Sequence, residues 1–337
     1  MTYEEFIKEF NNQESFIVAK TSGSTGTPKL IKLNKDFICK SAERTINFFK
    51  LNRDSRLHSC ISPDYIGGKM MAVRAILAKA ALTWEVPSNK PLKNIDKNEV
   101  LDLVAVVPSQ MIFLIENKNN LPDIRNIIIG GSSIHSELRK KIIDSGFNAY
   151  ETYGMTETAS HIALRKICKE NIPFATLPGV RVDKDGDNCL KILLDSGEVV
   201  QTNDIAEIVS DHEFFIKGRR DHIIISGGKK INPFEIEEKI SPLIPTDFCI
   251  TGFSDEKWGQ KLVLIIRGKE KDFKNLRNRL REIIKPWELP KEILYVKFLP
   301  YSENGKIIRP KDTSNLVFSD PDTYPSFEEQ KKPGQSQ

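Results

Sequence analysis

The chain has 337 residues, of which 39% are hydrophobic and 28% charged, and its formal net charge is only +4. These values are typical of a globular protein with two domains, and the scattered basic residues give no reason to expect a nucleic-acid or polybasic membrane partner. The five cysteines and five histidines lack disulfide or metal-ligand spacing, and no secretory leader or apolar run of membrane-spanning length is visible, so we expect a cytoplasmic protein without stable membrane insertion.

The first informative element is a loop between two short apolar strands, 16–19 and 30–33. Its glycines would let the backbone approach a polyphosphate, its hydroxyls would donate hydrogen bonds, and its lysine would supply a positive charge. The residues concerned are Thr21, Ser22, Gly23, Ser24, Thr25, Gly26, Thr27 and Lys29. The glycine spacing differs from that of the Walker phosphate loop. An ordinary solvated turn is the alternative on composition alone.

The middle of the chain alternates apolar strands with a helix. Strands are predicted at 103–107, 126–129 and 147–152, and a helix at 136–144 ends before Gly146. This alternation predicts an α/β core with mostly internal strands. Ligands in such sheets gather where strands end, so Gly130, Gly131 and the segment 153–158 are site candidates by position.

A β-rich subdomain is predicted at 174–213, with the strand end 202–204 inside it. A new unit follows, in which Asn232 and Pro233 provide a helix N-cap and first turn. Strands at 248–250, 262–266 and 293–298 and a helix at 273–284 predict a small α+β domain. The expected organisation is an N-terminal domain 1–220, a mobile C-terminal domain 221–312 joined by a hinge, and a disordered tail 313–337.

Seven segments, taken in order, resemble the AMP-forming adenylating superfamily, which includes the acyl-CoA synthetases. They are 21–29, 130–133, 152–158, 202–204, 218–237, 252–260 and 299–309. The stretch from Tyr153 to Arg165 is most similar to the o-succinylbenzoate–CoA ligases of menaquinone biosynthesis. Such enzymes join a carboxylate to ATP, release pyrophosphate, and pass the acyl group to the thiol of CoA.

The resemblance implies a nucleotide site, in which the loop 21–29 wraps the β- and γ-phosphates. Glu157 is expected to bind Mg²⁺ and Thr156 to lie at the α-phosphate. Tyr153 is expected against the adenine, and Asp204 and Arg219 at the ribose. The remaining predicted nucleotide contacts are Gly130, Gly131, Ser132 and Gly154. Taken singly, Asp204 could be a turn residue and Tyr153 a core tyrosine.

The C-terminal part carries the second set of implied roles. Lys306 matches the catalytic lysine of the first half-reaction, although alone it would read as a surface lysine. Asp221 matches the hinge about which the small domain rotates. Gly227 and Gly228 would open a tunnel for the pantetheine arm of CoA, or form a plain hairpin turn.

The acid pocket is the least defined part. o-Succinylbenzoate has two carboxylates, so a cation or a set of N–H donors is needed to hold the one that does not react. Lys69 and Arg74 are the candidates, although a helix over 70–74 could equally leave Arg74 on the surface. Tyr65 stands where many relatives have a histidine, and His161 either lies near the pocket or is structural.

Relatives usually carry roughly 150 further residues before the phosphate loop, about one domain. We therefore expect part of the large domain to be missing or replaced, with a homodimer as one way to cover exposed sheet edges. Three alternatives stay open: another acyl- or aryl-CoA ligase, an adenylating enzyme that loads a carrier protein, and a non-enzymatic relative that binds nucleotide.

Overall fold

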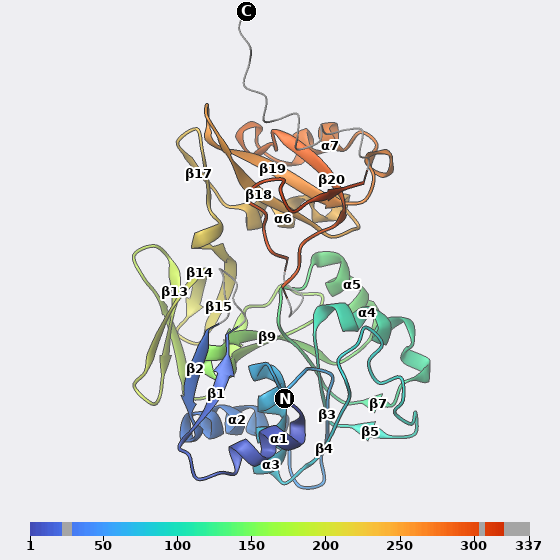
Figure 1. The fold of residues 1–337 in the computed structure, drawn as a ribbon, viewed down its shortest axis with the longest axis vertical. Coiled ribbons are helices and arrows are strands. Elements are labelled where there is room, and N and C mark those ends of the chain that lie inside the picture. Colours follow the sequence, from blue (N-terminus) through green and yellow to red (C-terminus); the bar gives the residue numbers. More distant parts are fainter. Residues whose placement is uncertain (22–28, 303–306, 320–337) are drawn as a thin grey trace, which may run out of the picture. The chain divides into compact units, whose positions relative to one another are not determined.

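The structure is a computed structural model, and it describes residues 1–21, 29–302 and 307–319. The chain forms two compact units. One comprises Met1–Arg220, and the other comprises Asp221–Tyr301 with the described residues from Ile307 onward. Figure 1 shows the elements of both units.

The N-terminal unit begins with a helix, a hairpin and two further helices. Helix α1 (Tyr3–Phe10) starts at a capping box made by Thr2 and Glu5. Strands β1 (Phe16–Lys20) and β2 (Leu30–Asn34) lie where the sequence predicts them, and they pair antiparallel. Helix α2 (Lys35–Phe49) is capped by the Asn34 side chain, and α3 (Ile66–Ala78) is buried along most of its length.

The N-terminal unit is built on one 11-stranded sheet. Its parallel part has the order β4-β3-β6-β8-β9. The strands are β3 (Arg56–Ser59), β4 (Ala81–Trp84), β6 (Leu103–Val106), β8 (Ile127–Ile129) and β9 (Ala149–Met155). Short strands β5 (Val100–Leu101) and β7 (Asp123–Ile124) pair separately.

Side chains of β6 and β8 alternate between two cores, which is why every residue of both strands is buried. Leu103 packs in a core with Met71 of α3, whereas Val104 packs in a core with Met111 of α4 (Pro108–Glu116). The second core also contains Ile142 of α5 (Ser136–Ser145). Helices α1 to α3 thus cover one face of the parallel strands, and α4 and α5 cover the other (Figure 1).

Antiparallel strands complete the sheet and form the predicted β-rich subdomain. They are β10 (Ser160–Lys166), β11 (Phe174–Thr176), β12 (Val180–Lys184), β13 (Cys189–Leu194), β14 (Val199–Ser210) and β15 (Glu213–Arg219). At the opposite end of the sheet, β4 is an edge strand with mostly exposed residues. The homodimer expected to cover such edges stays a prediction.

The C-terminal unit is an α+β layer. Its strands are β16 (Ile224–Ser226), β17 (Lys229–Ile231), β18 (Phe248–Asp255), β19 (Gly259–Arg267), β20 (Glu292–Phe298) and β21 (Val317–Phe318). Helices α6 (Pro233–Ile240) and α7 (Leu276–Ile283) pack on it. Asn232 caps α6 with its side chain, as predicted.

The predicted fold class is confirmed: a large α/β unit with a β-rich part precedes a small α+β unit. One prediction needs correction. Disorder was expected from residue 313. In the structure, Val317 of β21 pairs with Phe298 of β20, and the neighbouring Leu316 is buried in the core. Residues 320–337 lie outside the described part. Within the described ranges, no helix is both long and apolar enough to cross a membrane.

Candidate active site

Three predicted nucleotide-site residues meet in the large sheet of the N-terminal unit. Asp204 of β14 is paired in register with Arg219 of β15, and Arg219 Nη1 lies 3.0 Å from Asp204 Oδ1. Tyr153 of β9 donates its hydroxyl to Asp204 Oδ2 at 2.6 Å. The Asp204 amide is in turn held by Thr202 Oγ1 at 3.0 Å.

The environment keeps the Tyr153 hydroxyl protonated. Asp204 is 9% exposed, and each of its oxygens accepts a hydrogen bond. Burial, reinforced by the Asp204 charge, raises the pKa of Tyr153 well above its usual value, so the phenol stays a donor. The carboxylate is therefore fixed in place, and its remaining lone pairs are available to hydroxyl donors such as those of a sugar.

The turn after β9 carries the two residues expected at the phosphates. Thr156 and Glu157 lie in a 3₁₀ turn, Thr156–Thr158. Thr156 is buried, whereas Glu157 is exposed, as a carboxylate that binds a hydrated cation must be. Gly154 precedes them, where a Cβ would come within 2.2 Å of the Ser160 carbonyl oxygen. Glycine at this position is thus required by the close approach of β10.

The two glycines after β8 have different local requirements. A Cβ on Gly130 would lie 2.6 Å from Thr152 Oγ1, so the backbone there packs tightly against β9. Gly131 has a φ of +94°, a conformation that side chains disfavour. Ser132 follows and is half-buried. Both glycines lie at the carboxyl end of β8, as the sequence predicts.

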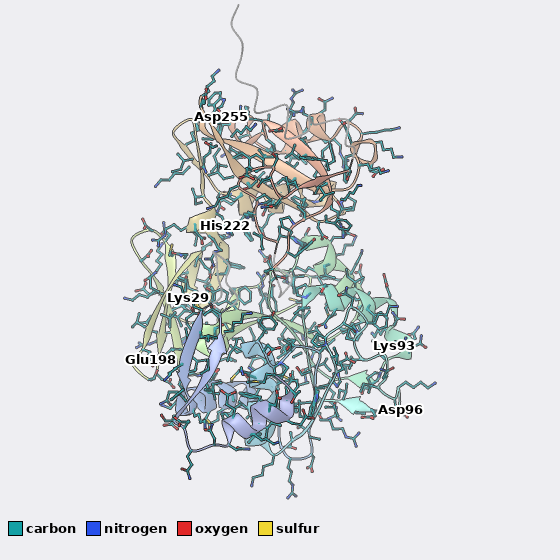
Figure 2. All side chains as sticks on the ribbon, in the orientation of Figure 1. Lys29, Lys93, Asp96, Glu198, His222 and Asp255 are labelled. Atoms are coloured by element: carbon teal, nitrogen blue, oxygen red, sulfur yellow. The ribbon has the colours of Figure 1, made fainter. Side chains whose placement is uncertain are left out.

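Only the base of the predicted phosphate loop is described. The Thr21 amide donates to the Lys29 carbonyl at 2.8 Å, and the Lys29 amide donates to Thr21 Oγ1 at 3.0 Å. The Lys29 side chain is exposed beside β2 (Figure 2). Ser22, Gly23, Ser24, Thr25 and Gly26 lie outside the described residues, as does Lys306.

Two predicted acid-pocket residues meet inside the N-terminal unit. Arg74 of α3 is 1% exposed, and His161 of β10 is 3% exposed. Arg74 Nη2 lies 3.5 Å from His161 Nδ1, and His161 Nε2 lies 2.9 Å from Thr45 Oγ1. Since a guanidinium only donates, Nδ1 is the acceptor and the Nε2 proton points to Thr45.

The charge in this pair is on the arginine. Burial, and then the neighbouring Arg74 charge, lowers the pKa of His161 well below its ordinary value, so the ring is neutral. Burial lowers the pKa of Arg74 to about 9, which leaves the guanidinium charged at neutral pH. Within the described residues Arg74 makes no ion pair with a carboxylate, and its Nε has no hydrogen-bond partner. The sequence did not predict whether Arg74 is buried or exposed, and in the structure it is buried.

The other two acid-pocket candidates lie elsewhere on α3. Lys69 is 2% exposed and turns toward α1, with Nζ 3.8 Å from Glu9 Oε2 and 4.5 Å from the Phe6 ring centroid. Tyr65 is half-buried at the N-cap of α3 and makes no side-chain cap. Neither was found beside His161, so their substrate roles stay predictions.

In the C-terminal unit, Gly227 and Gly228 form the two-residue turn between β16 and β17, with φ values of +56° and +75°. Two positive φ values indicate a type I′ hairpin turn, so backbone conformation alone accounts for both glycines. Asp221 lies in the 3₁₀ turn Arg220–His222, where the unit begins. The tunnel and hinge roles stay predictions.

One structural pair within the resembling segments had no predicted role. Arg309 donates to Glu237 Oε2 at 2.7 Å and so links α6 to the segment 307–319. It also reaches the Ile250 carbonyl of β18. Basic and acidic residues are common in both segments, and nothing in the sequence marks these two as partners.

Comparisons with known proteins agree with this geometry. The family model described as AMP-binding enzyme matches residues 8–218. The chain is 28% identical over 328 residues to 2-succinylbenzoate–CoA ligase from Lactococcus lactis subsp. lactis (strain IL1403), covering 89% of this chain and 71% of the relative.

Solved structures show the same similarity. The acyl-CoA synthetase (AMP-forming)/AMP-acid ligase II-like protein from Dyadobacter fermentans is 32% identical, with 90% of each chain covered and a TM-score of 0.59. The o-succinylbenzoate CoA synthetase from Bacillus subtilis, in complex with ATP and magnesium ion, is 19% identical. That match has a TM-score of 0.73 and covers 87% of this chain and 68% of the other.

The family model matches well over half of the chain, and the strands that carry Tyr153 and Asp204 fall inside the match. The predicted class of adenylate-forming ligase is thereby confirmed, and this chain belongs to the AMP-binding enzyme family.

Proposed function

We propose that the chain activates o-succinylbenzoate with ATP to an acyl-adenylate and then transfers the acyl group to CoA, a step of menaquinone biosynthesis. The observation that carries the choice of acid is the buried Arg74 guanidinium, which has no carboxylate partner among the described residues. The name of the L. lactis relative supports the same acid.

Burying a charged side chain away from water costs free energy. A buried cation without a counter-ion is expensive, so proteins normally pair it. The chain does this for Arg44, which is 6% exposed and lies 2.6 Å from Asp195. A dicarboxylate would bring the missing negative charge to Arg74 while its other carboxylate reacts. His161 would stay neutral beside it and hold the guanidinium in position.

For the first half-reaction we assign ATP and Mg²⁺ to the N-terminal domain, 1–220. Asp204, with Arg219 and Tyr153, would hold the ribose and adenine. Glu157 has the exposed carboxylate that Mg²⁺ prefers, and Thr156 lies next to it. The magnesium ion would supply charge neutralisation at the phosphates. The loop 21–29 and residues 130–132 complete the proposed nucleotide contacts.

For the second half-reaction we assign CoA to the C-terminal domain, 221–312. Asp221 would serve as the hinge, and Gly227 with Gly228 would border the pantetheine arm. Lys306 would act in the first half-reaction as the cation at the reacting oxygens. The cytoplasmic location and the homodimer expected from the sequence belong to this proposal.

The test measures the two half-reactions separately. Purified chain with ATP and Mg²⁺ is given o-succinylbenzoate, benzoate or a straight-chain monocarboxylate, and pyrophosphate release is followed. CoA is then added, and AMP release and thioester mass are measured. We expect pyrophosphate release to be greatest with o-succinylbenzoate and thioester to form only with CoA.

Each other outcome contradicts a defined part of the proposal. Pyrophosphate release that is equal for benzoate and o-succinylbenzoate would remove the dicarboxylate assignment. Adenylate without thioester would favour an enzyme that loads a carrier protein. No pyrophosphate with any acid would favour a module that only binds nucleotide.

A further inference from the structure

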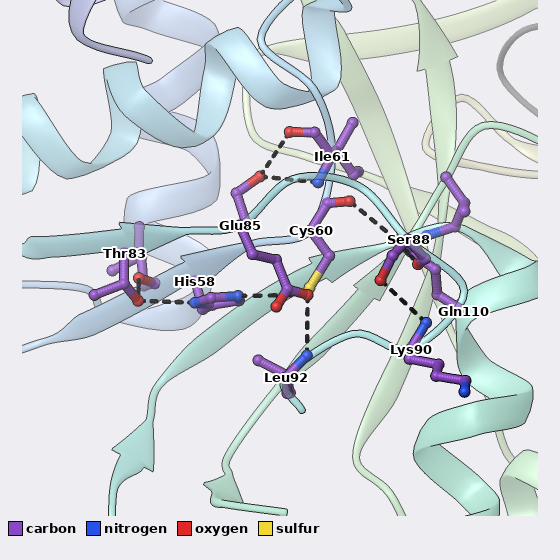
Figure 3. Close-up of polar contacts among 12 residues, drawn as sticks. His58, Cys60, Ile61, Thr83, Glu85, Ser88, Lys90, Leu92 and Gln110 are labelled. Carbon is purple, nitrogen blue, oxygen red and sulfur yellow. Dashed lines mark hydrogen bonds and ion pairs between the residues drawn. The ribbon is translucent and has the colours of Figure 1, made fainter. Parts of the chain in front are cut away.

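A second cluster of chemically reactive side chains lies at the carboxyl ends of β3 and β4. His58, Cys60 and Glu85 bring one nitrogen, one sulfur and one oxygen within 4.8 Å of one another. Figure 3 shows the three side chains pointing toward one another. Nothing in the proposed function uses them.

The sheet itself brings these residues together. β3 and β4 are adjacent parallel strands in which His58 pairs with Thr83 and Ser59 with Trp84. Residues two apart on a strand share a face, so His58 and Cys60 point to the same side, and Thr83 and Glu85 point there too. The Glu85 amide still bonds the Ser59 carbonyl at 3.3 Å, which keeps the two strand ends side by side.

One nitrogen of the His58 ring contacts a hydroxyl, and the other has no hydrogen-bond partner among the described residues. Thr83 Oγ1 lies 3.4 Å from the Leu57 carbonyl, to which only the hydroxyl can donate, and 2.8 Å from His58 Nδ1. Nδ1 thus lies in hydrogen-bond distance of Thr83, and Nε2 faces Glu85. That Nε2 is buried without a hydrogen-bond partner and lies 4.0 Å from Glu85 Oε1.

A lone pair that faces a carboxylate in a buried place is unfavourable unless a cation lies between them. The cation is either a proton on Nε2 or a metal ion. Cys60 favours the metal, because its sulfur completes a nitrogen, sulfur and oxygen ligand set of the kind that binds Zn²⁺.

We propose that His58, Cys60 and Glu85 bind a divalent transition-metal ion, best suited to Zn²⁺, through Nε2, Sγ and a carboxylate oxygen. Tetrahedral bonds of about 2.1 Å place nitrogen and oxygen ligands about 3.4 Å apart. The 4.0 Å separation of His58 Nε2 and Glu85 Oε1 is close to that value, and a small contraction of side chains completes the site.

The surrounding contacts hold the ligands as metal sites require. Thr83 orients the His58 ring from its other nitrogen, and the Leu92 amide donates to Glu85 Oε1 at 2.9 Å. Gln110 donates to the carbonyls of Cys60 and Ser88, each at 3.0 Å, and so ties the ligand segment to α4 (Figure 3). These bonds leave the three ligand atoms in the described geometry before any ion arrives.

An entry path for the ion is present. A cavity of about 560 Å³ opens beside Glu85, between Ser88 and Lys93. Glu85 keeps 20% of its side chain exposed, while His58 is fully buried. Metal and a water molecule as fourth ligand can therefore arrive from the side of Glu85.

The H-x-C spacing explains why the sequence indicated no metal site. Two ligands two residues apart fit a strand, and the third ligand lies on a neighbouring strand that only the sheet brings near. The proposed metal site therefore depends on the parallel pairing of β3 and β4 and does not depend on which acid the enzyme uses.

The test uses Co²⁺ and Zn²⁺ on the purified full chain after treatment with a chelator. Cobalt should bind at one equivalent and show a thiolate-to-metal charge-transfer absorption, which Zn²⁺ abolishes by displacement. Cys60→Ser should lose that absorption, and Glu85→Gln should weaken Zn²⁺ binding by at least about 10-fold. Zn²⁺ should also raise the Tm of the parent chain but not that of Cys60→Ser.

The matched control is Cys39→Ser, which removes a half-buried thiol from α2 and should leave metal binding unchanged. If Cys60→Ser does not fold, the Zn²⁺ affinity of Glu85→Gln tests the proposal instead. This variant keeps the shape of a partly exposed side chain and should fold. The proposal is overturned if the parent chain shows no charge-transfer absorption or if Cys60→Ser keeps that absorption. It is also overturned if Glu85→Gln binds Zn²⁺ as tightly as the parent chain does. Doubly protonated His58 by NMR in the presence of Zn²⁺ would do so as well.

Discussion

The two halves of the proposed active site treat charge in opposite ways. On the nucleotide side, the Asp204 carboxylate is bonded by both Arg219 and Tyr153. On the acid side, Arg74 is more deeply buried than Asp204, yet within the described residues it has no carboxylate partner. One cluster is electrostatically complete before any ligand arrives, and the other is not.

This difference separates two ways to prepare a binding site. A complete cluster is rigid and presents a fixed acceptor, so its ligand pays little for reorganisation. An incomplete cluster stores an unfavourable charge that the right ligand neutralises, which makes it selective for that ligand at the expense of stability. The substitutions below should therefore lower binding in both clusters but change stability with opposite signs.

Asp204→Ala should have the largest effect. It removes the carboxylate that accepts one hydrogen bond from Arg219 and one from Tyr153. The carboxylate is proposed to make one charge-assisted hydrogen bond to the ribose, which contributes about 1.5–3 kcal/mol, so we expect kcat/KM for ATP to fall on the order of 100-fold. Steady-state pyrophosphate release at varied ATP measures this, and urea unfolding should show a less stable chain.

The control for this prediction is Asp187→Ala. Asp187 pairs with Arg220 at 2.9 Å, but both side chains are largely exposed. An exposed pair contributes little, so kcat/KM should stay within about twofold of the parent chain. Equal losses in the two variants would mean that Asp204 has no special place in the nucleotide site.

Arg74→Met should change binding and stability in opposite directions. Removing the buried unpaired charge should raise the free energy of unfolding by about 1 kcal/mol or more. The same change should weaken o-succinylbenzoate by about 30-fold, because one charge-assisted interaction is lost, while the KM for ATP stays unchanged. Urea unfolding and isothermal titration with the acid measure the two effects.

Arg44→Met is the matched control, since Arg44 is also buried but is paired with Asp195. It should lower stability or leave it unchanged, and the acid should bind as before. The comparison between the clusters fails if Arg74→Met is destabilised like Arg44→Met. It also fails if Arg74→Met binds o-succinylbenzoate and benzoate with the same ratio of affinities as the parent chain.

Much of the fold follows from the sequence because its signals are local. The apolar runs of β6 and β8 mark internal strands, and Asn232 with Pro233 marks the start of α6. Boundaries were less well predicted where pairing decides them: β18 extends to Asp255 because its hairpin with β19 continues to Gly259. The pairing of Val317 with Phe298 likewise depends on a partner strand, not on local composition.

The site was predicted as a set of residues but not as a geometry. Ordered motifs identified Tyr153, Asp204 and Arg219, whereas their contact arises from the register of β14 with β15 and from the position of β9. The meeting of Arg74 and His161 joins a helix to a strand and has no local signal. Whether a cation is buried depends on tertiary packing, so the sequence alone did not predict that Arg74 is buried.

The pH dependence of stability tests whether Arg74 holds His161 neutral. Burial and the Arg74 charge lower the pKa of His161 in the folded chain, so in acid the unfolded chain binds a proton that the folded chain does not. This contribution to stability is complete above about pH 6.5, the unfolded pKa, and is lost as pH falls below it. The loss should reach about 1.4 kcal/mol per pH unit.

His161→Gln should remove that loss. Urea unfolding from about pH 7.5 to pH 5 should show the parent chain losing stability relative to the variant only below the unfolded histidine pKa. Arg74→Met should reduce the loss in the His161-containing chain, because one of its two causes is gone. Parallel curves for parent and His161→Gln would show that this ring does not titrate as described.

Tyr153→Phe should have the smallest effect and tests how far the nucleotide cluster depends on one hydroxyl. The variant loses the 2.6 Å bond to Asp204 but keeps its ring, whose centroid lies 5.2 Å from that of Phe214 and 5.9 Å from that of Phe174. Arg219 still holds the other carboxylate oxygen. A net cost of about 1 kcal/mol corresponds to a rise of about fivefold in the KM for ATP, with kcat unchanged. A loss as large as that of Asp204→Ala would instead place the hydroxyl itself in contact with the nucleotide, and the cluster would then not be complete without its ligand.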